Sequence, residues 1–229
     1  MYWNRCTFCS EPLPLMQDLC LSCQKLLPYI GGGNHDSRCR RCANTLNLAQ
    51  QLDLVCGVCQ AHPPDYHLVR TLFPYQFPVD QLIHRLKYQR QLPNARMLGN
   101  LWANTLSSQI DRPTVELLLP VPLHRRRLRQ RGFNQSLELA KPLARHLNLT
   151  IDRHALKRAI DTPPQTELSF KHRRKNVQGA FKADATRLRG KRVAVVDDVM
   201  TTGSTVSAIA TCLKKAGVKY CEVWVLARA

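Results

Sequence analysis

One run of apolar residues that passes into acids, threonines and a glycine restricts the fold of this chain most. It reads Val-Ala-Val-Val-Asp-Asp-Val-Met-Thr-Thr-Gly-Ser-Thr and covers residues 193–205. Four consecutive apolar residues without alternation favour a parallel strand that is covered on both faces. Further apolar residues then recur at intervals of three and four, as on a helix face; they are Val206, Ile209, Ala210 and Leu213. The sequence therefore predicts a strand, a hydroxyl-rich turn and a helix, which is the repeating unit of an α/β fold.

The turn between this strand and helix has the chemistry of a phosphate site. Hydroxyls and backbone N–H groups would gather at the positive end of the helix. Gly203 permits a positive φ or a close approach of the backbone. Asp197 and Asp198 would stand at the carboxyl end of the strand, where open α/β sheets bind ligands. Two carboxylates would repel a phosphate, and sugar hydroxyls together with Mg²⁺ between carboxylates and pyrophosphate remove that conflict.

The same run resembles the phosphoribosyl-pyrophosphate (PRPP) signature of type I phosphoribosyltransferases. The shared pattern is a hydrophobic strand, two acids, two spacer residues and Thr-Thr-Gly-Ser-Thr. The resemblance implies that Asp197 and Asp198, the candidate catalytic pair, bind the ribose 2′- and 3′-hydroxyls. It also implies a 5′-phosphate loop made of Thr201, Thr202, Gly203, Ser204 and Thr205. An ordinary turn with helix-capping residues is the alternative, but capping needs only one such residue. A catalytically silent PRPP sensor would use the same residues.

Four Cys-x-x-Cys pairs occupy the first 59 residues: Cys6 and Cys9, Cys20 and Cys23, Cys39 and Cys42, and Cys56 and Cys59. Each pair places two sulfurs on one side of a tight loop, so two pairs complete a tetrahedral zinc site. We expect two structural Zn²⁺ ions bound by pairs that follow each other in the chain. Interleaved pairing, first with third and second with fourth, is also compatible with the sequence. Redox use of Cys-x-x-Cys and iron–sulfur ligation are weaker alternatives.

Length and composition allow one substantial core with a small additional domain in a chain of 229 residues. No segment approaches the roughly 18 uninterrupted apolar residues of a membrane span. The start of the chain lacks the apolar region of a signal peptide, so we expect a cytoplasmic protein without membrane insertion. In a reducing cytoplasm, ten cysteines favour metal binding over disulfides.

A proline-rich linker at residues 62–65 separates two predicted domains. Residues 1–68 would form a double zinc ribbon, and residues 69–229 a phosphoribosyltransferase-like parallel sheet flanked by helices. An amphipathic helix follows Pro78, and at its end Lys87 and Tyr88 would have the option of facing a ligand. A solvated lysine is the expected outcome there.

A strand at residues 115–119 leads through Pro-Val-Pro into a loop with five arginines. By the resemblance to phosphoribosyltransferases, the turn after this strand is the pyrophosphate loop. Arg129 and Arg131 are then phosphate ligands, since guanidinium groups match phosphate oxygens bidentately. A second strand near residues 155–158 leads into a predicted mobile lid at about 160–180 that would close over PRPP and exclude water.

The positive charge is concentrated in the middle of the chain. Residues 120–192 hold 19 basic and 5 acidic residues, an excess of 14 out of the total of +18. Such a block attracts polyanions, either pyrophosphate or nucleic acid, although a solvated basic face is the simpler interpretation. Aromatic residues make up only 7% of the chain, which argues against strong stacking on single-stranded DNA.

Motifs along nearly the whole chain resemble the ComF/GntX family of competence proteins. Besides the cysteine pairs and the PRPP signature, they are Pro-Val-Pro at 120–122, Arg-Gly-Phe-Asn-Gln at 131–135, Thr-Pro-Pro-Gln at 162–165 and Arg-x-Asn-x-x-Gly-Ala-Phe at 174–181. The resemblance implies a part in the uptake of transforming DNA, with PRPP, single-stranded DNA and cytoplasmic competence proteins as candidate partners. The resemblance does not identify an acceptor substrate. Thr201 stands where 6-oxopurine enzymes carry an acid, which argues against hypoxanthine or guanine. The oligomeric state is left open.

Overall fold

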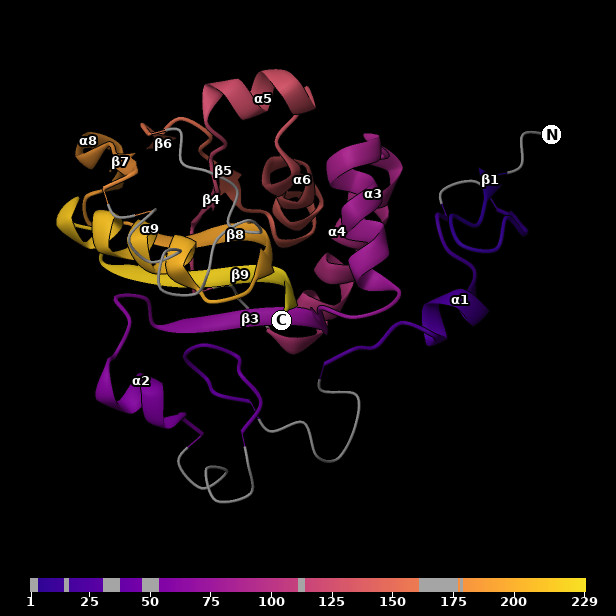
Figure 1. Cartoon of the computed structure of the whole chain (residues 1–229), viewed down its shortest axis with the longest axis horizontal. Helices are drawn as coiled ribbons and strands as arrows, with labels where there is room; N and C mark the ends of the chain where they lie inside the picture. Colours follow the sequence, from indigo (N-terminus) through magenta and orange to yellow (C-terminus); the bar gives the residue numbers. More distant parts are fainter. Residues whose placement is uncertain are drawn as a thin grey trace.

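The structure of the protein is a computed structural model, and it describes residues 4–14, 17–30, 38–46, 54–110, 114–160, 177 and 179–229. Figure 1 shows the order of the elements along the chain. The strands are β1 (Asn4–Arg5), β2 (Pro12–Leu13), β3 (Leu68–Pro74), β4 (Leu117–Pro120), β5 (Thr150–Ile151), β6 (Leu156–Arg158), β7 (Phe181–Ala183), β8 (Arg192–Met200) and β9 (Tyr220–Arg228). The helices are α1 (Leu21–Lys25), α2 (Gly57–Ala61), α3 (Val79–Gln89), α4 (Leu92–Gln109), α5 (Arg125–Arg131), α6 (Gln135–Leu147), α8 (Ala185–Leu188) and α9 (Ser204–Lys215).

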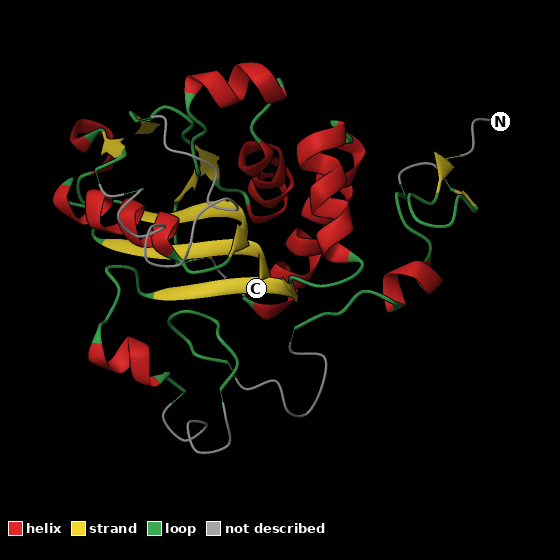
Figure 2. Ribbon diagram, viewed as in Figure 1, coloured by secondary structure: helices red, strands yellow, loops and turns green. Residues whose placement is uncertain are grey.

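A five-stranded sheet in the order β3-β9-β8-β4-β5 forms the centre of the molecule, and every neighbouring pair in it is parallel. The predicted strand, turn and helix are confirmed as β8, residues 201–203 and α9. The run of apolar residues places β8 in the sheet interior, between β9 and β4. Together with the flanking helices visible in Figure 2, this arrangement is a parallel α/β fold, as predicted.

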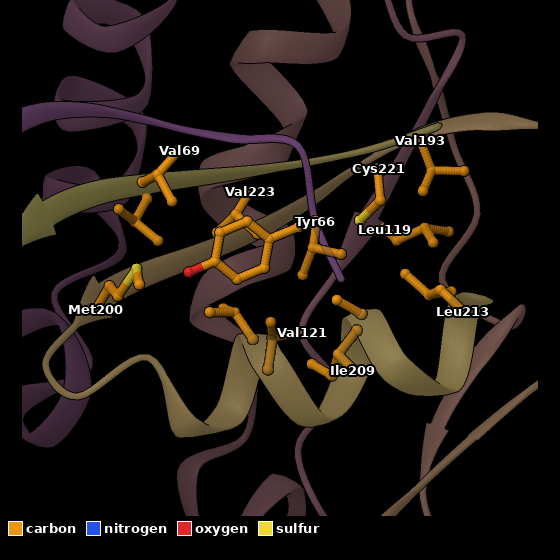
Figure 3. Close-up of a cluster of buried hydrophobic side chains, with 14 of the residues drawn as sticks. Tyr66, Val69, Leu119, Val121, Val193, Met200, Ile209, Leu213, Cys221 and Val223 are labelled. Carbon is orange, nitrogen blue, oxygen red and sulfur yellow. The ribbon is translucent and has the colours of Figure 1, made fainter. Parts of the chain in front are cut away.

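Both faces of the sheet are buried. On one face, Val193 and Val195 of β8 pack with Ile209 and Leu213 of α9 (Figure 3). On the other face, Ala194 and Val196 belong to a cluster with the apolar side chains of α3, α4 and α6. Successive side chains of a strand point to opposite faces, so an uninterrupted apolar run supplies both layers.

The eight cysteines of the first 59 residues form two groups that pack against opposite parts of the fold. The first tetrad, Cys6, Cys9, Cys20 and Cys23, belongs in part to the cluster with α3 and α4. The second tetrad, Cys39, Cys42, Cys56 and Cys59, belongs to the cluster that contains α9. The N-terminal segment is therefore attached to the sheet domain on both sides.

Three local expectations differ from the structure. The strand near residues 155–158 is β6, which pairs antiparallel with β7 outside the main sheet. Strand β3 was not anticipated, because polar residues interrupt its apolar pattern. The arginine-rich segment expected to be a loop is helix α5. Residues 161–176 and 178 of the expected lid lie outside the described residues.

Candidate functional site

One of the predicted carboxylates, Asp197, and most of the hydroxyl-rich turn share one hollow at the carboxyl end of the sheet. The hollow is lined by Asp197, Val199, Met200, Thr201, Gly203, Ser204, Thr205 and Val206. It lies where β8 ends and α9 begins, which is where parallel sheets bind ligands. The end of β4 is beside it, because Pro120 pairs with Val196 and the amide of Val121 donates to the carbonyl of Val196 at 2.9 Å. The expected pyrophosphate loop thus begins next to Asp197.

Asp197 is buried at 8% exposure and is held by two donors. The hydroxyl of Ser136 in α6 donates to its Oδ1 at 2.9 Å, and the backbone amide of Asp198 donates to the same oxygen at 3.0 Å. Burial, with the charge of Asp198 as the next cause, raises the pKa of Asp197 to about 7. Near neutral pH the protonated form of this carboxyl is therefore populated beside the ionised form.

Asp198 is buried as well and forms an ion pair with Lys87 at the end of α3. The Lys87 Nζ lies 2.6 Å from Asp198 Oδ2, and the two side chains are 20% and 4% exposed. Burial disfavours the ammonium, but the nearby Asp198 carboxylate outweighs it and raises the pKa of Lys87. The expectation of a solvated lysine was wrong, since Lys87 is a charged group of the site itself.

The turn from residue 201 to 205 has the geometry of an anion site. Gly203 has a φ of 76°, and a Cβ there would lie 2.7 Å from Met200 Cε, so a side chain would meet both strain and a collision. The hydroxyls of Thr202 and Ser204 share a hydrogen bond of 2.7 Å, and the Ser204 amide donates to Thr202 Oγ1 at 3.3 Å. The N-terminal end of α9 adds the positive end of a helix dipole.

The two arginines proposed as phosphate ligands lie differently. Arg131 is half-buried at the end of α5, where its Nη1 donates to Gln135 Oε1 at 2.5 Å and its guanidinium lies 5.8 Å from the ring centroid of Tyr88. Burial lowers the pKa of Arg131, and the carboxylate of Asp198 acts against that effect. Arg129 is exposed on the same helix. The structure thus places Arg131 within electrostatic reach of Asp198 and leaves Arg129 on the outer surface.

Arg228 at the end of β9 connects the phosphate turn to the second tetrad. Its Nη1 donates to the carbonyls of Met200 at 2.9 Å and Thr201 at 2.5 Å. Its Nε donates to the carbonyl of Cys42 at 2.9 Å, and its Nη2 donates to Asn44 Oδ1. One buried guanidinium therefore joins the start of the turn to a cysteine loop near the other end of the chain.

The two tetrads suit a tetrahedral metal ion. In each, the four sulfurs lie within 4.8 Å of one another, and the groups follow the sequential pairing that we expected. Burial favours the neutral thiol, but backbone N–H donors outweigh it and lower the pKa of Cys6 to about 6 and of Cys39 to about 7. Burial and the neighbouring cysteines raise the pKa of Cys23 and Cys59, so the fit to the predicted ions rests on the four converging sulfurs, which are the donor set of a tetrahedral zinc site.

Sequence reasoning missed two contributors to the site, Ser136 and Arg228, and expected a third, Lys87, to be solvated. Ser136 lies in the first turn of α6, and Asn134 caps this helix by accepting from the Ser136 amide. A hydroxyl in the first turn of a helix and a lysine in the last turn are common on surfaces, so nothing in their local pattern marks them.

Known relatives match almost the whole chain, and one family model matches its C-terminal part. The family model described as phosphoribosyl transferase domain matches residues 134–229. The chain is 35% identical to DNA utilization protein YhgH of Escherichia coli O157:H7, over 99% of this chain and 91% of that protein. It is 34% identical to competence protein F of Haemophilus influenzae, over 98% of this chain and 97% of that protein. Competence protein ComFC of Streptococcus pneumoniae is 25% identical over 92% of this chain and 87% of that protein.

Solved structures match more distantly. The allosteric regulatory enzyme of purine biosynthesis is 22% identical with a TM-score of 0.40, over 58% of this chain and 26% of that one. A score this low bears no weight for function. Among the described residues, no helix has both the length and the apolar character needed to cross a membrane.

Proposed function

Because the chain belongs to the family of competence protein F and DNA utilization protein YhgH and carries a phosphoribosyl transferase domain, we propose that it binds Mg²⁺–PRPP and acts in the cytoplasm during natural DNA uptake. One observation carries the proposal: a buried carboxylate pair and a hydroxyl-rich helix N-terminus meet at one edge of the sheet. That combination matches a phosphorylated sugar, which offers hydroxyls at one end and a phosphate at the other.

In this proposal the carboxylates and the turn divide the ligand between them. Asp197 and Asp198 accept hydrogen bonds from the two ribose hydroxyls, and the turn from Thr201 to Thr205 holds the 5′-phosphate. The backbone N–H groups of the turn, its hydroxyls and the dipole of α9 favour the phosphate charge. Arg131, with the loop after β4, faces the pyrophosphate. The carboxylates would lie near Mg²⁺ bound with PRPP, and the ion would supply positive charge against the pyrophosphate.

The reaction that suits this site is transfer of the phosphoribosyl group to an acceptor. The bond between C1 of the ribose and the pyrophosphate oxygen breaks, the acceptor forms a new bond to C1, and pyrophosphate leaves with the bond electrons. Protein side chains orient the sugar and stabilise the leaving charge, and this requires no covalent nucleophile. The acceptor is unidentified, and the 6-oxopurine bases remain disfavoured because position 201 is threonine.

The two tetrads complete the proposal as structural zinc sites. Each offers four sulfurs at ligand spacing, and neither tetrad lies at the carboxylates. Zinc there would fix the N-terminal segment against the sheet domain, because an eight-thiol segment of this length has little apolar core of its own.

The first test is calorimetry with Mg²⁺–PRPP. Asp198→Asn is expected to abolish detectable binding, and the matched surface variant Glu138→Gln is expected to bind like the wild type, since Glu138 forms only an exposed pair with Lys141. Circular dichroism checks that both variants fold. Unchanged affinity in Asp198→Asn would reject the proposed site. Release of pyrophosphate from labelled PRPP with candidate bases, with and without single-stranded DNA, then tests for transfer.

A second function, that of an adaptor which binds single-stranded DNA and is regulated by PRPP, is favoured by helix α5. This helix has the sequence Arg-Arg-Arg-Leu-Arg-Gln-Arg and no buried residue. It therefore presents a cationic surface beside the expected pyrophosphate loop, where a polyanion would be attracted. Such an adaptor would also contact other cytoplasmic competence proteins. Salt-dependent strand binding that is lost when Arg125, Arg126 and Arg127 become glutamine, with no turnover in any acceptor screen, would identify it.

A further inference from the structure

The Lys87 ammonium is paired with Asp198 Oδ2, an oxygen that the proposed ribose contact requires. Asp198 Oδ1 accepts the backbone amide of Val199 at 2.8 Å, and the buried Oδ2 faces the Lys87 ammonium at 2.6 Å. Both oxygens of this carboxylate are therefore engaged within the protein. A ribose hydroxyl can reach Oδ2 only if the ammonium moves or shares the oxygen.

The surroundings of Lys87 hold it toward the site. It stands in the last turn of α3, whose Ile83 and Leu86 are fully buried, Ile83 in the cluster that contains β8 and β9 residues, and the helix ends at the left-handed residue Arg90. The helix is therefore fixed, while the four-carbon side chain of lysine can swing over a few ångströms. The charged and titratable groups that face the ammonium are Asp197, Asp198, Tyr75 and, beside Asp198, Arg131.

The chemistry of PRPP shows where a displaced ammonium would go. The pyrophosphate is attached to C1 of the ribose, and the neighbouring C2 carries a hydroxyl of the pair assigned to the carboxylates. A cation next to the carboxylate that binds this hydroxyl is therefore next to the pyrophosphate. Ribose 5-phosphate has the same hydroxyls and 5′-phosphate but no pyrophosphate, so it offers the ammonium no new anionic partner.

From this geometry we infer that Lys87 exchanges partners on binding and thereby selects PRPP over ribose 5-phosphate. Its ammonium neutralises Asp198 while no sugar is present, gives up this carboxylate to the ribose hydroxyls, and then binds the pyrophosphate. The inference rests on the proposed function. It makes Lys87 a specificity residue for the leaving group, a role separate from that of the phosphate turn.

The test is a comparison of two ligands on three proteins by calorimetry. Lys87→Met should lower the affinity for Mg²⁺–PRPP about ten- to a hundredfold, the range expected for one charge-assisted contact. The same variant should bind ribose 5-phosphate as well as the wild type or better, because nothing competes for Oδ2. Lys87→Arg should recover part of the PRPP affinity, and Lys141→Met, which removes an exposed lysine of α6, should change neither ligand.

A measurement on the wild type covers the case in which Lys87→Met does not fold. The protein is treated with an amine-acetylating reagent, and mass spectrometry measures the modification of each lysine. Lys87 should be acetylated faster in the presence of ribose 5-phosphate than in the presence of Mg²⁺–PRPP, while the acetylation rate of Lys141 should be the same with both ligands. Equal weakening of both ligands in Lys87→Met, unchanged PRPP affinity, or identical labelling of Lys87 under both ligands would overturn the inference alone. Failure of the wild type to bind PRPP would reject the proposed function and the inference with it.

Discussion

Replacing Asp197 by asparagine should stabilise the protein at alkaline pH while it abolishes sugar binding. The aspartate is buried, and its neutral form is favoured because burial and the charge of Asp198 oppose ionisation. An asparagine oxygen can accept the same two hydrogen bonds, from the Ser136 hydroxyl and the Asp198 amide. The variant therefore keeps the packing and removes the cost of a second buried negative charge.

The size and sign of this effect follow from proton linkage. The pKa of Asp197 is about 7 in the folded protein and 3.8 in an unperturbed chain, and at 1.36 kcal/mol per pKa unit the difference corresponds to about 4 kcal/mol. Between these two values the folded state holds a proton that the unfolded state has released. The stability of the wild type therefore falls as the pH rises from about 4 to about 7, and the full cost is present above that window.

Urea unfolding of the wild type and Asp197→Asn at about pH 5 and about pH 8 measures the effect. The stability difference in favour of the variant should grow by roughly 2 to 3 kcal/mol between the two conditions. Loss of metal and titrations of groups away from the carboxylate pair affect both proteins alike and cancel in the difference. A difference that is independent of pH, or a variant that is less stable than the wild type at pH 8, would refute this account of the carboxylate pair.

Three further substitutions probe the turn, the helix packing and the link to the second tetrad. Gly203→Ala should lower PRPP affinity about tenfold or more and cost about 1 kcal/mol of stability, because φ at this position is positive and the new Cβ would lie too close to Met200 Cε. Wild-type affinity of this variant in calorimetry would contradict the expectation. Gly99→Ala should cost about 1 to 3 kcal/mol in urea unfolding and leave PRPP affinity unchanged, because its Cβ would lie 2.8 Å from Pro142 Cγ between α4 and α6. Arg228→Met should weaken PRPP binding and destabilise the fold by about 2 to 4 kcal/mol, because the carbonyls of Cys42 and Met200 lose their buried donor. Calorimetry that gives the variant the PRPP affinity of the wild type would show that the turn is independent of the second tetrad.

Local patterns explain which parts of the fold were predictable. The apolar run of β8, the positive-φ Gly203 and the repeat of α9 all lie within one short stretch, and each acts on its own neighbours. The cysteine pairs are equally local, and the short loops between successive pairs favour the grouping that the structure has. Strand β3 was missed because its seven residues alternate poorly, and α5 was missed because no residue of it is buried to create a periodic signal.

The remaining site residues could not be read from the chain, because their partners come from distant elements. Ser136 meets Asp197 across 61 residues, and Arg228 meets Cys42 across 186. Lys87 looks like any lysine at the end of a surface helix until α3 packs against the sheet and turns it toward Asp198. Contacts between residues so far apart leave no periodic pattern in the sequence from which they could be predicted.

The sequence by itself determined the ligand chemistry of this protein: a pair of acids, a turn of hydroxyls with a glycine, and two sets of four thiols, each complete within a short segment. Only the tertiary structure decided the burial, the ion pairing and the pKa values of these groups. The packing of α3 and α6 beside β8 buries the acids, places the Lys87 cation at Asp198 and raises the pKa of Asp197. The physical reason is that the charge of a buried group depends on its solvation and on its nearest counter-charge, and both are set by segments far away in the chain.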